Sequence, residues 1–468
     1  MYNFPLLNTD NDDIDKAYRL ALATIGCNIV NRSNSNEENP LLLAGLGYDN
    51  PWVRDTSINT WNGCGLICPN VTKNTLLSLY DQDSKVINEA TGQSWDTVIW
   101  AVGAWYQYLY TGDLEFLKTA YEIVKKTLAV FEENEFDSEV NLFRGPACYG
   151  DGISAYPDVY VTGDSGILAF AEERRSLCVD NGLGIPMFTL STNCLYYYVY
   201  IIADKMAIEL NKPREYSGKA VKLRSAINNA FWSDKKGDYQ YIIDKFGGCD
   251  SNEGLGTSFA IIFDIADKEK IKKIFMNHYL TDHGVPCVWP TFGRYKKSAS
   301  EYGRHSGTVW PFIQGFWADA AARCGRIDLF DNEFIKQTDN ALKSCQFAEI
   351  YHPVSGEMYG GLQEENGKII NWQSMPFQTW SASAYLRNVY MDILGMRFDT
   401  DGIHFSPCGS RTVQRVDISG IKYLDSSLSI KIRGNGLHIK EFKINQKKRM
   451  PFFPKSKDRK STRLNSSH

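Results

Sequence analysis

The chain has 468 residues, of which 43% are hydrophobic and 13% aromatic, and a formal net charge of −4. This length allows roughly two to four domains, or one large domain with an appendage, and a large apolar core. Lys and Arg are dispersed without a basic stripe, which argues against a nucleic acid partner, and no apolar run reaches membrane length. The 26 Tyr, 24 Phe and 11 Trp exceed what a core requires and favour a cleft lined by aromatic rings.

The two termini and the cysteines indicate the compartment. The 11 cysteines are scattered without a CxxC pair, which is typical of reduced thiols, and the N-terminus lacks a basic region followed by an apolar one. We therefore expect a cytoplasmic protein.

Residues Asp458–His468 (DRKSTRLNSSH) resemble a translated sequencing-adapter oligonucleotide. They are excluded from the predicted fold, and the natural chain is expected to have been cut short.

Apolar residues at helical spacing predict paired helices along most of the chain. Ser94–Thr111 is apolar nearly all round, whereas Leu114–Glu133 is amphipathic, and only Gly112–Asp113 joins them. The same contrast recurs further along. The predicted helices are Asp12–Asn31, Val71–Gln82, Ser94–Thr111, Leu114–Glu133, Leu190–Leu210, Tyr216–Trp232, Glu253–Ala266, Lys268–His278, Ser306–Cys324, Asn332–Cys345 and Phe377–Leu394, with a further helical region after the Gly-rich loop that starts at Pro40. A buried helix followed by a solvent-facing one, repeated about six times, predicts a toroid of inner and outer helices.

The pattern changes at Thr400. From there apolar and polar residues alternate, and β-branched residues and turn signals such as GNG are frequent, which predicts antiparallel strands. The sequence thus predicts a mainly α chain with a helical toroid over 1–399, a partial β accessory region over 400–457, and the adapter-like tail over 458–468.

One stretch, Phe347–Leu386, combines an acid with several aromatic residues. Glu349 lies in a loop before a helix and has Tyr351, Trp372 and Trp380 nearby in sequence. Aromatic rings around a carboxylate suit a carbohydrate, because sugar C–H faces lie on rings while hydroxyls bond to acids and amides. A surface Glu beside core aromatics would give the same pattern.

A second acid, Asp151, lies in the loop ACYGDGISAYP, where Gly150 and Gly152 permit close backbone approach. Glycoside hydrolysis needs one protonated carboxyl group to donate to the leaving oxygen and one ionised carboxylate to activate water. Asp151 suits the acid, with a pKa raised by burial against aromatics, and Glu349 suits the base. Glu357 and Glu253 are rival bases, and Asp151 could instead cap a turn.

An ordered set of motifs resembles one family. The motifs are PWVRDTSI, LFRGPACYGDG, LSTNCLYY, YGRHSGTVWP and EIYHPVSGE followed by FQTWSASAYL, spread over roughly Asn39 to Gly395. Together they resemble the six-hairpin glycosidases, most of all the mannosylglycerate-hydrolase-like and family 63 group, and more loosely the glycogen-debranching glucosidases, glucoamylases and trehalases.

The resemblance implies an (α/α)6 barrel that hydrolyses an α-linked gluco- or manno-configured glycoside from its end, with inversion. By position, Asp151 matches the family's general acid and Glu349 its general base, while Arg54 and Asp55 resemble its clamp on the terminal sugar. Two departures are that Gly303–Arg304 intervene in YGRHSGTVWP, and that GPACYGDG lacks the Trp usual before the acid.

The remaining candidates are expected to contact the sugar, although each aromatic could equally be core and Arg54–Asp55 could be a structural ion pair. They are Trp52, His305, Trp310, Glu357, Trp372, Gln378 and Trp380. No metal or cofactor is predicted, since His278 and His283 lack a third ligand. A small carbohydrate is the expected partner. A sugar phosphorylase, an epimerase and a non-catalytic sugar-binding protein remain alternatives.

Overall fold

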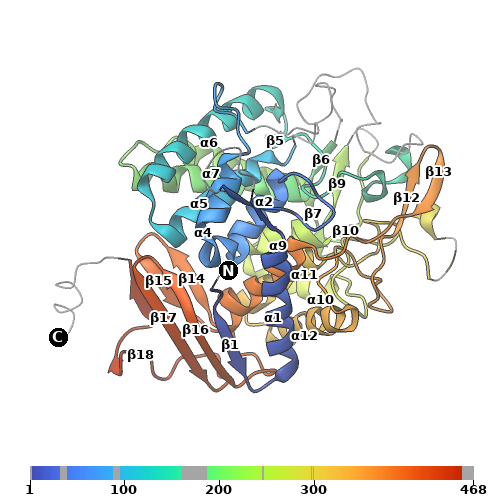
Figure 1. Cartoon of the computed structure of the whole chain (residues 1–468). Helices are drawn as coiled ribbons and strands as arrows, with labels where there is room; N and C mark the ends of the chain where they lie inside the picture. The colour runs from blue at the N-terminus through green and yellow to red at the C-terminus, as the bar shows by residue number, and fades with distance from the viewer. Residues whose placement is uncertain are drawn as a thin grey trace.

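A computed structural model describes residues 3–31, 39–87, 95–160, 187–244, 247–296, 298 and 300–455 (Figure 1). Its centre is a closed ring of six helices, in which each helix packs against the next and the last packs back against the first. In ring order these are α2 (Val53–Asn59), α5 (Trp100–Thr111), α7 (Leu190–Glu209), α9 (Gly254–Ile262), α11 (Pro311–Arg323) and α13 (Thr379–Arg387). The predicted toroid is confirmed. The adapter-like tail lies outside the described residues.

Amphipathic helices surround this ring. They are α1 (Asp12–Cys27), α4 (Pro69–Leu77), α6 (Leu114–Asn134), α8 (Ser217–Phe231), α10 (Lys268–Asn277) and α12 (Ile327–Ser344), with a short α3 (Gly65–Ile67). The α5–α6 hairpin illustrates why the pairs form. Gly112 adopts a left-handed conformation (φ 69°) that ends α5, and the side chain of Asp113 accepts the Phe116 N–H to begin α6.

Several predicted boundaries are wrong for local reasons. The first helix ends at Cys27, because Ile29–Asn31 (β2) pairs with Pro40–Leu42 (β3) in a hairpin. The helix predicted from Ser306 begins only at Pro311, since the missing N–H of proline is tolerated in the first turn. The helix predicted from Phe377 begins at Thr379 because Phe377 has φ 50°.

Other boundaries also shift. The helix predicted over Val71–Gln82 spans Pro69–Leu77 (α4), and α12 begins at Ile327 rather than Asn332. α13 continues as a π-helix, η8 (Asn388–Ile393). Ser94, the predicted start of α5, lies outside the described residues. A 3-10 turn, η2 (Thr97–Ile99), precedes α5.

Aromatic side chains fill the axis of the ring. Trp61, from the π-helix η1 (Thr60–Cys64), packs at 4.8 Å from Phe316 and also contacts Tyr198, Phe259 and Phe263. We call these five residues the axial aromatic cluster. Trp61 is fully buried, so the cluster separates the two ends of the ring.

The antiparallel strands predicted after Thr400 are present. One sheet has the order β14 (Met396–Asp399), β15 (Gly402–Phe405), β20 (Phe452–Pro454). A second contains β16 (Arg415–Tyr423) and β17 (Ser426–Arg433) and takes its third strand, β1 (Leu6–Thr9), from the other end of the chain, with Leu7 opposite Ile418. Figure 1 shows β1 beside these orange and red strands. β1 was not predicted from the sequence.

The other strands are short pairs in the loops. They are β4 (Phe136–Asp137) with β5 (Leu142–Phe143), β6 (Met187–Thr189) with β9 (Ile242–Asp244), β7 (Trp232–Ser233) with β8 (Asp238–Tyr239), β10 (Asn252–Glu253) with β11 (Val288–Trp289), β12 (Leu362–Glu365) with β13 (Lys368–Asn371), and β18 (Lys443–Ile444) with β19 (Lys447–Lys448). Across the described parts of the chain, no helix combines the length and the apolar character needed to cross a membrane.

Candidate active site

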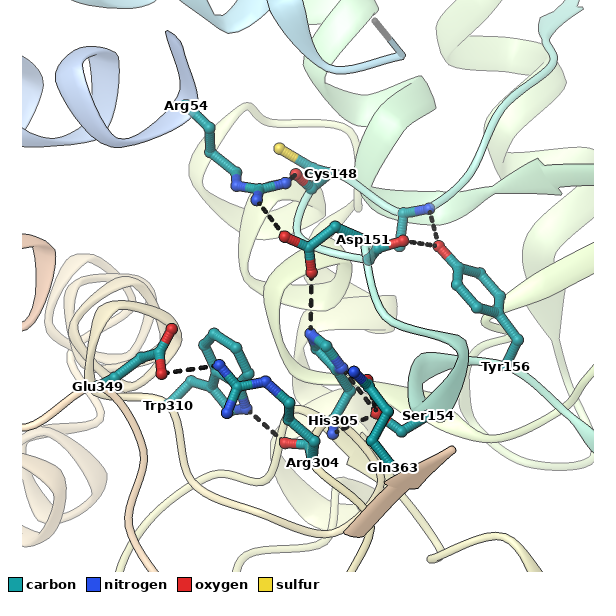
Figure 2. A network of polar contacts seen from close by, with 12 residues as sticks. Arg54, Cys148, Asp151, Ser154, Tyr156, Arg304, His305, Trp310, Glu349 and Gln363 are labelled. Atoms are coloured by element: carbon teal, nitrogen blue, oxygen red, sulfur yellow. Dashed lines mark hydrogen bonds and ion pairs between the residues drawn. The ribbon is translucent and has the colours of Figure 1, made fainter. Parts of the chain in front are cut away.

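The N-terminal ends of the inner helices, and the loops before them, bring most of the predicted site residues to one end of the ring. Arg54 and Asp55 lie in the first turn of α2, and Gln378 directly precedes α13. Asp151 lies in the loop before the 3-10 turn η3 (Ile153–Ala155), His305 in the loop before α11, and Glu349 in the loop before α13. Figure 2 shows Asp151 and Glu349 with Arg54, Arg304 and His305 around them.

Asp151 is held by a buried guanidinium group. Arg54 donates from Nη2 to Oδ2 of Asp151 at 3.1 Å and from Nη1 to the carbonyl of Cys148 at 2.9 Å (Figure 2). Its Nη1 also donates to Oδ2 of Asp96 at 2.8 Å. Arg54 and Asp96 are buried, whereas a third of the Asp151 side chain remains exposed. One edge of this carboxyl group is therefore open to a ligand.

The loop around Asp151 is tightly packed, as the two glycines suggested. The Tyr156 hydroxyl donates to the Gly150 carbonyl at 2.6 Å and accepts the Ala147 N–H at 3.1 Å. A Cβ on Gly150 would lie 2.1 Å from this hydroxyl, and a Cβ on Gly152 would lie 2.1 Å from Oε1 of Gln363. A larger residue at either position would force these side chains, or the loop, to shift, so the packing around Asp151 favours glycine at both.

His305 faces Asp151 from the other side, with its Nε2 3.6 Å from Oδ1. Its Nδ1 lies 2.9 Å from Oγ of Ser154, which itself donates to Oε1 of Gln363 at 3.0 Å. The tautomer of His305 decides which of Nδ1 and Ser154 Oγ is the donor. Burial lowers the pKa of His305 to about 3, so the ring is neutral at pH 7. His305 thus flanks the Asp151 carboxyl group as a neutral ring.

Glu349 has its own guanidinium group. Arg304 donates from Nη2 to Oε2 of Glu349 at 2.8 Å, and the backbone N–H of Met375 donates to the same oxygen at 3.2 Å. The Arg304 guanidinium is sandwiched between Trp310 and Trp372, 5.4 Å from each ring centroid. Among the described residues Oε1 of Glu349 has no hydrogen-bond partner, which leaves it available to accept a proton from water.

Asp55 lies close enough to both acids to interact with them. It accepts a long hydrogen bond of 3.4 Å from Nε2 of Gln378. Burial, together with repulsion from Glu349 and Asp151, raises the pKa of Asp55 to about 7 despite the opposing effect of Arg54. The same three carboxylates act on the Tyr48 hydroxyl, whose pKa burial and these charges raise. Three acids and two guanidinium groups thus form one electrostatic cluster.

One electrostatic prediction is wrong. Asp151 was expected to have a raised pKa from burial against aromatics. Burial is the largest single effect and acts in that direction, but attraction to the surrounding cationic groups, Arg54 foremost, together with the Arg54 hydrogen bond, outweighs it and holds the pKa of Asp151 below its ordinary value. The carboxyl group is therefore ionised at neutral pH in the free protein.

The predicted aromatic residues divide into two groups. Trp310 and Trp380 are buried; Trp310 stacks on His305 at 4.7 Å, and Trp380 on Phe312 at 4.3 Å. Trp52 and Trp372 are only partly buried. Trp52 and Trp372 therefore keep exposed ring surface on which a sugar ring could stack.

The two acids that were alternative candidates for the general base, Glu357 and Glu253, have other partners. Glu357 is exposed and faces Lys343 at 3.6 Å. Glu253 is fully buried, where it accepts the backbone N–H of Ser191 at 3.1 Å.

Within the described ranges no group of three or more His, Cys, Asp and Glu side chains is placed to hold a metal.

Four residues of the cluster were not predicted. They are Asp96, Ser154, Arg304 and Gln363. Arg304 had a usable signal, because it immediately precedes His305 in YGRHSGTVWP, but its partner Glu349 is 45 residues away.

Residues 24–387 match the family described as amylo-alpha-1,6-glucosidase. The chain belongs to this family of glycoside hydrolases. It is the debranching group that the motifs resembled more loosely, and the assignment to the (α/α)6 glycosidases is confirmed. No match was found among curated protein sequences.

Solved structures share the family's fold at low sequence identity. A sialidase has 13% identity and a TM-score of 0.69 over 92% of this chain, which spans 38% of that protein. A GH78 rhamnosidase of a Bacillus species has 13% identity and a TM-score of 0.63 over 92% of this chain and 40% of its own. A GH63 mannosylglycerate hydrolase from Thermus thermophilus, solved with glucose, has 14% identity and a TM-score of 0.59 over 80% of this chain and 100% of its own.

Proposed function

We propose that the chain hydrolyses an α-linked, gluco- or manno-configured glycoside from its end with inversion, with Asp151 as general acid and Glu349 as general base. The observation that carries this proposal is the pair of carboxylates in one cluster, each held by its own arginine. In each acid one oxygen is bound, by Arg54 or Arg304, and the other is turned away from that arginine.

Glu349 fits the base, because its bound oxygen accepts two N–H donors while the other is free. Each N–H donor needs a lone pair on the acceptor oxygen, and an ionised carboxylate provides these. Water held near Oε1 would lose its proton to Glu349 as it attacks the anomeric carbon.

Asp151 fits the acid once a sugar is bound. Covering its exposed edge removes water, which favours the neutral carboxyl group. His305 lies on the other side of this carboxyl group, with its Nε2 3.6 Å from Oδ1. The ring tautomer that is protonated on Nδ1 would favour the protonated acid, because its Nε2 could accept the acid's proton in a hydrogen bond.

The test compares leaving groups. An α-glycosyl fluoride leaves with little protonation, whereas a methyl α-glycoside requires the acid. Asp151→Asn should lower kcat/KM for the methyl glycoside by about 10²–10⁴-fold and for the fluoride far less, and Glu349→Gln should lower both. Asp158→Asn, at an exposed acid bonded to Arg294, is the matched control. Equal losses on both substrates in Asp151→Asn would remove the acid role.

Proton NMR of the first-formed product tests the stereochemistry. Inversion of an α-glycoside releases the β-anomer, so the α-anomer as first product would exclude the inverting mechanism. Dependence of the rate on inorganic phosphate, with formation of a sugar 1-phosphate, would instead indicate a phosphorylase.

A further inference from the structure

A second cavity, of about 380 Å³, lies at the other end of the helical ring. It is lined by residues from the C-terminal ends of α5, α7, α9 and α11, and by η8 and β14. Its volume falls within the range of about 300–1,000 Å³ that is typical of small-molecule sites. The catalytic cluster, in contrast, is built from the N-terminal ends of the same helices.

The two sites are separate. Lys205 in the cavity is 15 residues along α7 from Leu190, so at 1.5 Å per residue the two ends are about 22 Å apart. The axial aromatic cluster lies between them, and two of its members, Tyr198 and Phe263, line the cavity. A ligand in the cavity would therefore not touch Asp151 or Glu349.

The cavity wall carries more basic than acidic side chains. Its charged residues are Lys205, Arg323 and Arg397, against a single carboxylate, Asp264. Arg397 is already paired with Asp319 and Asp392, at 2.9 and 2.8 Å. Arg323 donates from Nε to Oδ1 of Asp319 at 2.8 Å, but within the described part of the chain its Nη1 and Nη2 have no hydrogen-bond partner. Lys205 has only a distant partner, Asp399, at 3.9 Å. The free donors of Arg323 and Lys205 suit an anionic group.

The rest of the wall suits a sugar ring. Three tyrosines, Tyr106, Tyr197 and Tyr198, line it, all of them only partly buried. Tyrosine supplies an apolar face for sugar C–H groups and a hydroxyl that bonds to sugar hydroxyls. Tyr198 is held rigidly by stacking on Phe263 at 4.0 Å and 9°. Preformed rings beside cations that still have free N–H donors favour a ligand that carries both features.

We propose that this cavity is a second ligand site, independent of hydrolysis, that binds a monosaccharide bearing one anionic group. The anion would lie against Arg323 and Lys205, and the ring against the tyrosines. A phosphate and a carboxylate are the two sources of such an anion. The proposal does not rest on the function proposed for the catalytic cluster.

Calorimetric titration of the full chain with glucose 6-phosphate, glucuronate, glucose and inorganic phosphate tests this. One of the two anionic sugars should bind saturably and at least tenfold more tightly than glucose or phosphate. Lys205→Met should weaken that binding at least tenfold. Lys212→Met is the matched control, because Lys212, just beyond the end of α7, is equally exposed and also has one acidic partner.

A second variant tests whether binding requires the open volume of the cavity, rather than its charged side chains. Ile201→Trp places a bulky ring on the wall and should abolish binding while the far-ultraviolet circular dichroism stays unchanged. Binding should persist in Glu349→Gln, which alters only the catalytic cluster.

Three results would overturn the proposal. They are the absence of saturable binding of either anionic sugar at millimolar concentration, equal affinity for glucose and the anionic sugars, and binding lost in Glu349→Gln but kept in Lys205→Met. None of them bears on glycoside hydrolysis, which the leaving-group experiment tests separately.

Discussion

Arg54 joins Asp151 to Asp96 through two nitrogens of one guanidinium group, at 3.1 and 2.8 Å. An acid with a partly exposed edge is thereby fastened to a second acid that is buried. The planar fork of arginine permits this geometry, which a lysine could not reproduce. The position of Asp151 therefore depends on the buried pair of Arg54 and Asp96.

Asp151→Asn is expected to destabilise the protein at neutral pH but not in acid. The pKa of Asp151 is lowered in the fold, so its ionised form adds stability above the ordinary Asp pKa, near 4, and that contribution is lost as the pH falls through the lowered value. Urea unfolding at pH 7 should show a loss of the order of 1 kcal/mol, because the pair is partly exposed. At pH 3.5 the loss should be smaller. The same loss at both pH values would contradict the lowered pKa.

Gly152→Ala should reduce activity much more than Gly218→Ala. The new Cβ at residue 152 would lie 2.1 Å from Oε1 of Gln363 and 2.9 Å from Cε1 of His305, so Gln363 and His305, or the loop itself, must shift, and the surroundings of Asp151 shift with them. A shift of about 1 Å at a reacting group can cost about 10²-fold in rate. Gly218, in α8, has no atom within 4 Å of its added Cβ and is the control. Unchanged kcat/KM in Gly152→Ala would show that the loop is not fixed by these contacts.

Glu253→Gln should flatten the dependence of stability on pH. Burial raises the pKa of Glu253 to about 8, from 4.5. A raised pKa gives stability that is complete below the unfolded value and is lost as the pH rises through the folded one. The parent protein should therefore lose a few kcal/mol of unfolding free energy between about pH 5 and 8 that the Gln variant retains. Chemical denaturation across this range measures it, with Glu139→Gln at an exposed acid as control. Parallel curves for the parent and Glu253→Gln would show that the prediction is wrong.

Asp319→Asn should destabilise the ring severely. Asp319 is fully buried on α11 and accepts hydrogen bonds from Arg323, Arg387 and Arg397. Removing its charge leaves the fully buried guanidinium group of Arg387 without its counter-ion, which costs about 3–5 kcal/mol. Urea unfolding at pH 7 checks this against Asp328→Asn, an exposed acid paired with Arg326. A loss below about 1 kcal/mol, the size expected of an exposed pair, would show that water reaches the network.

Local signals in the sequence were enough for much of the fold. Leu114–Asn134 matches its prediction to one residue, because Gly112, Asp113 and an amphipathic pattern all act within the same stretch. The predicted helix boundaries were wrong where a tertiary partner or an unusual backbone angle sets the end of the helix, as at Ile29–Asn31 and Phe377. The strand β1 could not be predicted, since the strand that pairs with it lies at the opposite end of the sequence.

Among the residues of the candidate site, too, some could be predicted from local sequence and others could not. Asp151, Glu349, Arg54 and His305 lie in loops or at a helix start whose composition signals chemistry, and the structure brings them together. Their partners Asp96, Arg304, Ser154 and Gln363 were missed, because a pairing across the ring leaves no trace in local spacing. The same reason explains the wrong pKa direction for Asp151, which depends on a guanidinium group 97 positions away.

The pairing of Leu7 with Ile418 has a consequence for how the protein is made. The ribosome makes β1 roughly 400 residues before β16, so the edge of β1 stays uncovered while the chain between them is translated. Slowing elongation between the two strands would lengthen this interval, and aggregation of nascent chains would increase with it.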